Sequence, residues 1–159
     1  LSHSKIGYIG DHLTESRLKT YREVLARHGI PVDQNLIQIP DTRFEECGYK
    51  GMKAMLGAGA PTAVFAAYDD IAIGAMRAIS EHGLSIPEDI SVIGMDNVTV
   101  CPYLTKSLTT VSNPIKEMAA VSVSILSHKI EDRSFTVVQH VALKPELIVR
   151  ETTAALAKD

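Results

Sequence analysis

The sequence has no tryptophan, only two cysteines, and few aromatic residues, which make up 5% of its 159 positions. Cys47 and Cys101 neither form a disulfide framework nor match metal-ligand spacing, so a reduced, cytoplasmic setting is the simplest expectation. The histidines are scattered, without the i,i+4 pairs or neighbouring cysteines of a metal site. We therefore predict no metal centre and no cofactor.

Other absences narrow the class of protein. The formal net charge of −3 provides no electrostatic footprint for nucleic acid, and no apolar run is long enough to cross a bilayer. Gly57-Ala58-Gly59 follows a predicted helix and lacks a third glycine, so it is no dinucleotide fingerprint, and there is no P-loop. Neither an activated nucleophile nor a cofactor loop is visible. We predict a protein that is not an enzyme, and a chain that by itself binds neither DNA nor a membrane.

What is present is a repeated alternation of strand and helix. Short apolar runs at 6–9, 36–39, 62–66 and 90–93 predict buried strands, and apolar residues at helical spacing fill the intervals between them. A strand-helix-strand unit of this length implies parallel strands joined by a right-handed crossover. With 45% hydrophobic residues the chain can bury one core. The pattern predicts an α/β fold with a doubly wound parallel sheet.

The pattern changes after Val111. Asn113 suits a helix cap with Pro114 at the first helical position, and an apolar face follows, which includes Ile115 and Met118. The runs 137–143 and 147–149 predict two further strands. An apolar helix face that is left without cover predicts association, contact with an unseen segment, or disorder.

Polar side chains follow the predicted strands. In parallel sheets, ligands bind beyond the carboxyl ends of the strands, so these side chains are candidate ligand contacts. The adjacent carboxylates of Asp69 and Asp70 could serve as a catalytic pair. However, neighbouring residues point in different directions, and acids before an apolar periodic run are typical of a helix start. We predict that Asp69 caps its helix. The candidates at the strand exits are Asp11, Arg17, Arg43, Tyr68 and Asp96.

Several motifs resemble one family. They are TAVFAAYDDIAIGAMRAI, GLSIPEDISVIGMDN, the run Leu108-Thr109-Thr110-Val111, and LKPELIVRETT near the end. In this order and spacing they resemble the effector-binding core of the lactose-repressor/galactose-repressor (LacI/GalR) transcription regulators, over nearly the whole chain. The resemblance implies a periplasmic-binding-protein-like fold of type I. Because the chain starts with Leu1 rather than Met, we expect a fragment without the first lobe and the DNA-binding head.

The resemblance also implies a division of the chain. Residues 1–112 correspond to the C-terminal lobe, and 113–143 to a helix and strand that pack on the first lobe. Residues 144–151 correspond to a final strand that returns to the C-terminal lobe, and 152–159 to a tail.

The function that the resemblance implies is ligand sensing. A small effector, with a sugar favoured, binds between the lobes and modulates binding of operator DNA through the absent segment. Arg17 and Asp96 fall where the family holds its effector, and a guanidinium and a carboxylate can together clamp vicinal hydroxyls. The alternatives are a solvated position beside Glu15 for Arg17 and a turn or cap role for Asp96. Other candidate contacts are Asp11, Tyr68, Arg43, which falls where some relatives place an aromatic, and the neighbouring Phe44.

The resemblance further implies a homodimer. The candidate interface lies on the helices at 45–56 and 71–82 and the nearby loop, with residues Met52, Met55, Met76, Tyr103 and Leu104. For the three methionines a place in the core is the alternative. Two functions compete with a sugar-responsive regulator. One is a periplasmic-type sugar-binding protein, and the other is a regulator that responds to a purine or nucleoside.

Overall fold

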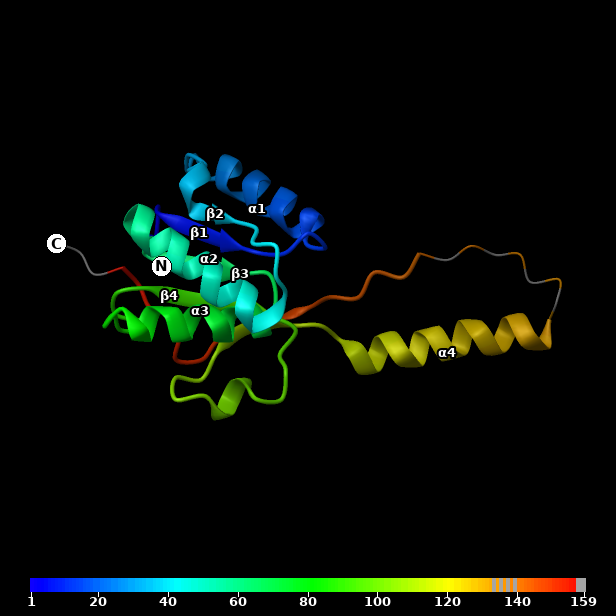
Figure 1. Cartoon of the computed structure of the whole chain (residues 1–159). Coiled ribbons are helices and arrows are strands. Elements are labelled where there is room, and N and C mark those ends of the chain that lie inside the picture. The colour runs from blue at the N-terminus through cyan, green and yellow to red at the C-terminus, as the bar shows by residue number, and fades with distance from the viewer. Residues whose placement is uncertain (133, 135, 137, 139, 157–159) are drawn as a thin grey trace.

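The computed structural model describes residues 1–132, 134, 136, 138 and 140–156, and its centre is a six-stranded sheet (Figure 1). The strand order is β2-β1-β3-β4-β5-β6. The strands are β1 (Ile6–Ile9), β2 (Ile37–Gln38), β3 (Ala63–Ala66), β4 (Ser91–Met95), β5 (Thr109–Ser112) and β6 (Glu146–Ile148). The first five are parallel, as predicted, whereas β6 runs antiparallel to β5, so the sheet is mixed.

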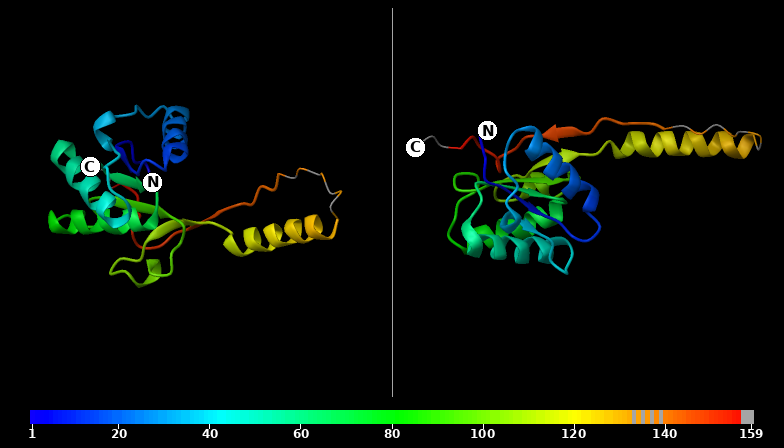
Figure 2. Two further views of the ribbon diagram at one scale, coloured as in Figure 1. Left: turned by 45° about the vertical axis from the view of Figure 1, so that its right-hand side comes forward. Right: turned by 90° about the horizontal axis from the view of Figure 1, so that it is seen from above.

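Helices cover both faces of the sheet, because alternate residues of each buried strand point to opposite sides (Figure 2). The ring of Tyr8 lies 5.3 Å from that of Tyr21, on α1 (Glu15–Arg27). The next residue, Ile9, points the other way, toward Gly51 of α2 (Phe44–Gly59). Helix α3 (Asp69–Glu81) packs beside α2 on that second face. This is the doubly wound arrangement that the sequence predicts.

A fourth helix, α4 (Ile115–Glu131), extends away from this lobe and has no buried residue (Figure 1). Its exposed apolar side chains include Ile115, Val123 and Ile130, which is 70% exposed. Residues 140–145 lead back to β6 (Figure 1). Within the described residues, no helix is both long and apolar enough to cross a membrane.

The last described residues are bonded into the lobe. The hydroxyl of Thr152 donates to the carbonyl of Val92 over 2.7 Å and accepts from the amide of Thr109 over 2.8 Å. The Leu156 amide donates to the carbonyl of Leu1 over 2.9 Å. The first and last parts of the described chain therefore meet at one end of the sheet.

Several predicted details differ in the structure. Leu36 belongs to a short 3₁₀ helix, η1 (Gln34–Leu36), which leaves β2 with two residues. Asn113 is not the cap of α4: Pro114 occupies that position, because the Asn113 side chain bonds elsewhere. In the predicted strand 137–143, positions 137 and 139 lie outside the described residues, and 138 and 140–143 form no strand.

Candidate functional site

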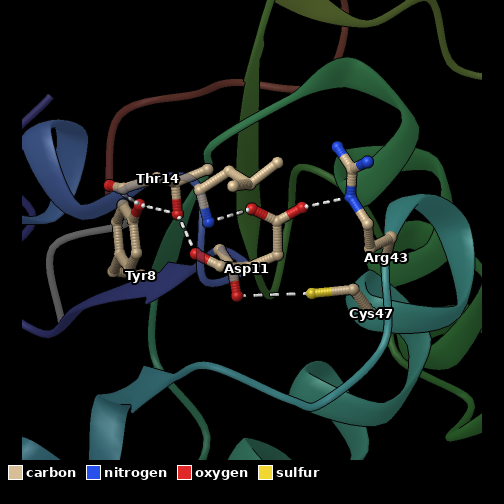
Figure 3. Close-up of polar contacts among 7 residues, drawn as sticks. Tyr8, Asp11, Thr14, Arg43 and Cys47 are labelled. Carbon is tan, nitrogen blue, oxygen red and sulfur yellow. Dashed lines mark hydrogen bonds and ion pairs between the residues drawn. The ribbon is translucent and has the colours of Figure 1, made fainter.

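The loop after β1 is held by buried polar groups. The hydroxyl of Tyr8 donates to that of Thr14 over 2.9 Å, which donates to the Asp11 carbonyl over 2.7 Å (Figure 3). Burial is the main cause of the raised pKa of Tyr8. On the other side of the loop, the thiol of Cys47 donates to the carbonyl of Gly10 over 3.3 Å. Side chains from β1, from the loop itself and from α2 therefore hold the backbone of this loop in place at the candidate site.

The carboxylate of Asp11 is buried and occupied by protein groups. One oxygen accepts from the amide of Leu13 over 2.9 Å, and the other accepts from Nε of Arg43 over 3.0 Å (Figure 3). Asp11 is 1% exposed, whereas the Arg43 side chain is 42% exposed. Asp11 is therefore buried beneath the site and holds Arg43 at its surface. The guanidinium carbon of Arg43 lies 4.5 Å from the centre of the Phe44 ring.

Arg17 lies in the first turn of α1 and reaches across the carboxyl ends of β3 and β4. Its guanidinium carbon stacks 4.5 Å from the centre of the Tyr68 ring, and its Nε lies 3.1 Å from the sulfur of Met95. Residues from three strand exits thus meet here. Stacking over an aromatic face favours the cation and fixes the plane of the guanidinium.

Asp96 follows β4 in an uncommon backbone conformation. Its φ is +116°, that of Asn97 is +55°, and the Asp96 amide donates to the carbonyl of Val111 over 2.8 Å. Non-glycine residues at positive φ persist where surrounding contacts hold them, often at ligand sites. One carboxylate oxygen of Asp96 accepts from the side-chain amide of Asn113 over 2.9 Å. Asp96 and Asn113 line an open groove of about 580 Å³ at the base of α4.

Arg17 and Asp96 are close enough to interact electrostatically. Burial raises the pKa of Asp96, while the positive charge of Arg17 and the Asn113 hydrogen bond act to lower it. No ion pair joins Arg17 and Asp96 within the described part of the chain. Each of the two side chains is held by its own protein partner, at the same edge of the sheet.

Asp69 has a different place from the predicted one. It is the first residue of α3, after the cap position at Tyr68, and its buried carboxylate accepts from the hydroxyl of Thr110 over 2.6 Å. The same carboxylate accepts from the amide of Val98 over 2.9 Å and the thiol of Cys101 over 3.2 Å. Gly94 permits this, since a Cβ there would overlap the Asp69 carboxylate. Asp69 therefore ties the loop after β4 to β5.

Comparison with known proteins identifies the family of this fold. The model of the periplasmic binding protein-like domain matches residues 1–153. This chain belongs to that family.

Among proteins similar to this chain are transcription regulators. The chain is 37% identical to the HTH-type transcriptional regulator DegA of Bacillus subtilis, with 98% of the chain and 47% of DegA covered. It is 30% identical to the HTH-type transcriptional repressor PurR of Photobacterium profundum, with 97% and 47% covered. The chain thus spans about half the length of these two relatives, both of which are transcription regulators.

A solved structure agrees. The chain superposes with a TM-score of 0.86 on a LacI family transcriptional regulator from Enterococcus faecium with bound ribose, at 31% identity. The alignment covers 98% of this chain and 59% of that one. The predicted resemblance to the LacI family and the predicted fold class are confirmed.

The residues predicted for a dimer interface divide into two groups. Met52 and Met55 are fully buried in the core, so they present no surface to a partner in this fold. Tyr103 is 84% exposed, and Met76 and Leu104 are partly buried. Met76 and Leu104 line an open groove of about 540 Å³ between α3 and the loop around Thr105.

Arg150 is a member of the site region that the sequence pattern did not indicate. Its guanidinium donates to the Asn97 side chain over 2.8 Å and to the carbonyl of Leu108 over 2.7 Å. It thereby joins the segment after β6 to the turn at Asp96. The sequence does not predict this contact, because Arg150 lies 53 residues from Asn97 along the chain.

We expect that Asp96→Asn stabilises the protein at neutral pH. The pKa of Asp96 is raised in the folded state, so ionisation of this side chain opposes folding as pH rises from the unfolded pKa of about 3.9 through the folded value. The amide cannot ionise. Urea unfolding should therefore show a higher free energy of unfolding for Asp96→Asn than for the wild type at pH 7, and this difference should shrink toward pH 3.5. An equal gain at both pH values would mean that ionisation is not its cause.

Proposed function

We propose that this chain is the effector-sensing part of a cytoplasmic bacterial transcription regulator whose effector is a sugar. The observation that carries the proposal is the convergence of Arg17, Tyr68 and Asp96 at the carboxyl ends of β1, β3 and β4. The ribose bound to the Enterococcus faecium regulator supports the same class of effector. The names of the relatives support the regulatory role.

The chemistry of these groups suits a polyol. The amino groups of Arg17 donate hydrogen bonds in a fixed plane, and Asp96 offers the oxygen that Asn113 leaves open to accept from hydroxyls. The exposed ring of Phe44, which is 43% exposed, offers an apolar surface for the face of a sugar ring. Because the side chains are already held by protein contacts, little ordering remains to be done on binding.

Coupling to DNA requires parts beyond this chain. We propose that the segment 113–143 packs on a first lobe, and that α2, α3 and the loop with Tyr103 and Leu104 form a homodimer interface. Effector bound between the lobes then favours one lobe orientation over another, and the dimer transmits this preference to a DNA-binding segment. The effector must bind the two states with different affinity for this to occur.

We expect Arg17→Ala to weaken ribose binding by about 10- to 100-fold, because hydrogen bonds from a charged donor contribute roughly 1.5–3 kcal/mol. Titration calorimetry on the full product of the gene would measure the Kd. Arg27→Ala is the matched control, since Arg27 is an exposed arginine at the opposite end of the same helix. Equal loss in both variants, or none in Arg17→Ala, would remove Arg17 from the site.

A purine effector is the second candidate, and the similarity to PurR favours it. The rings of Tyr68 and Phe44 could stack on a purine as they could on a sugar. Competition between adenine and ribose in the same calorimeter separates the two classes. Binding of the base alone, with Arg17 dependence, would keep the site and replace the sugar.

A further inference from the structure

Arg43 is held in place with part of its hydrogen-bonding capacity unused. Its Nε donates to the buried Asp11 carboxylate, and its guanidinium stacks on Phe44 at 4.5 Å. Figure 3 shows its two terminal amino groups directed away from Asp11. Within the described residues, Asp11 is the one side chain to which Arg43 donates a hydrogen bond. The amino groups are therefore available donors at the surface of the site.

The backbone supports this placement. Phe44 has a φ of +53°, which is uncommon for an aromatic residue, and this conformation sets its ring beside the Arg43 guanidinium at the start of α2. On the other side, both oxygens of Asp11 are already bonded. A ligand therefore meets an oriented guanidinium instead of a competing carboxylate.

Arg17 repeats the arrangement on the other side of the β1 exit. The Nε of Arg17 is directed to the Met95 sulfur, and its guanidinium stacks on Tyr68. Its terminal amino groups are therefore also available as donors. Arg43 comes from the loop after β2, and Arg17 crosses toward β3 and β4, so the two arginines flank the exit of β1. Beside these charged donors, Asp96 offers a carboxylate of which one oxygen accepts from the Asn113 side chain.

We infer that the effector is an acidic sugar, and that Arg43 binds its carboxylate or phosphate group while Arg17 and Asp96 bind its hydroxyls. Two amino groups in a fixed plane match the paired oxygens of such a group, and a single neutral hydroxyl leaves half of these donors unused. Anchoring by Asp11 and stacking on Phe44 limit the side-chain entropy lost on binding. This inference deepens the proposed function and rests on it.

The experiment compares acidic sugars with their neutral parents on the full product of the gene. Titration calorimetry with glucuronate against glucose, galacturonate against galactose, and ribose 5-phosphate against ribose gives a preference for each pair. We expect the acidic member of at least one pair to bind about 10- to 100-fold more tightly than its parent. The carboxylate and phosphate pairs show which of the two groups the site takes.

Substitution at Arg43 then tests the assignment. Arg43→Gln should reduce that preference to less than about threefold, because the paired donors for the anionic group are lost. Because this variant leaves Asp11 without its cation, Arg43→Lys is measured beside it. Lysine retains a charge near Asp11 but lacks the paired amino groups, so most of the preference should also disappear. Arg22→Gln, which removes an exposed arginine of α1, is the control.

The outcomes separate the two proposals. Neutral sugars that bind as tightly as their acids overturn the inference and leave the proposed function standing, as does a preference that survives in both Arg43 variants. If no sugar of either kind binds to the folded protein, the proposed sugar effector is wrong, and the inference falls with it. Thermal unfolding of each variant shows that the proteins compared are folded.

Discussion

Gly48→Ala is expected to destabilise the protein by about 3 kcal/mol or more, beyond the usual range for an overpacked core. A Cβ at this position in α2 would overlap the backbone carbonyl of Ile71 in α3. Gly74 of α3 faces the Glu45 carbonyl in the same way, so the two helices approach through reciprocal glycines. Backbone atoms cannot rotate aside as a side chain would, and the helices must separate.

Gly57→Ala is the matched control in the same helix. No atom lies within 4 Å of a Cβ built there, so alanine should raise stability by about 0.5–1 kcal/mol through its better helix propensity. Thermal unfolding should place Gly48→Ala roughly 10 °C below the wild type. Similar midpoints for the two variants would show that α2 and α3 do not depend on their close approach.

The hydrophobic pattern predicts the buried strands well, because both faces of β1 and β3 are covered and their sequences are apolar runs. It does not predict β5, whose Thr109 and Thr110 are buried through hydrogen bonds. Thr110 donates to Asp69, and Thr109 accepts from the amide of Arg150. Partners 41 residues distant are invisible to a local pattern, so a buried polar strand resembles a loop.

In the candidate site, too, the sequence predicts the positions of residues but not their contacts. The positions of Arg17, Tyr68 and Asp96 at strand exits follow from the parallel topology, and strand topology can be predicted from periodicity. What each side chain contacts does not follow. The bond from Asn113 to Asp96, the ion pair between Asp11 and Arg43, and the stacking of Arg17 depend on rotamers that the fold selects. The predicted role of Asn113 as a cap was wrong because its side chain found a partner across the sheet edge.

The second large effect is expected at Asp69. Asp69→Ala leaves the Thr110 hydroxyl, the Val98 amide and the Cys101 thiol without their acceptor, and Thr110 and Cys101 are fully buried. Each unsatisfied buried group costs about 1–3 kcal/mol, so we expect a loss of about 3 kcal/mol in the free energy of unfolding. Asp69→Asn keeps one acceptor oxygen and the volume, and should lose about half as much.

Asp70→Asn provides the control one residue away, with the opposite expected sign. Burial, helped by the charges of Glu45 and Asp69, raises the pKa of Asp70, so its ionisation opposes folding at neutral pH and the amide removes that penalty. Urea unfolding at pH 7 should therefore show a lower free energy of unfolding for Asp69→Asn and a higher one for Asp70→Asn. A loss of equal size in both would mean that the start of α3 tolerates no change, whatever its hydrogen bonds.

The effect at Asp69 should extend to the ligand. Thr110 accepts from the amide of Asn97 over 3.3 Å and donates to Asp69, so the Asp69 carboxylate fixes the turn in which Asp96 sits at positive φ. At a temperature where both proteins are folded, Asp69→Asn should bind its effector at least threefold more weakly than the wild type, although Asp69 itself is buried away from the site surface. Unchanged affinity would show that the Asp96 turn is held by its bonds to β5 alone, and that Asp69 contributes to stability without positioning the site.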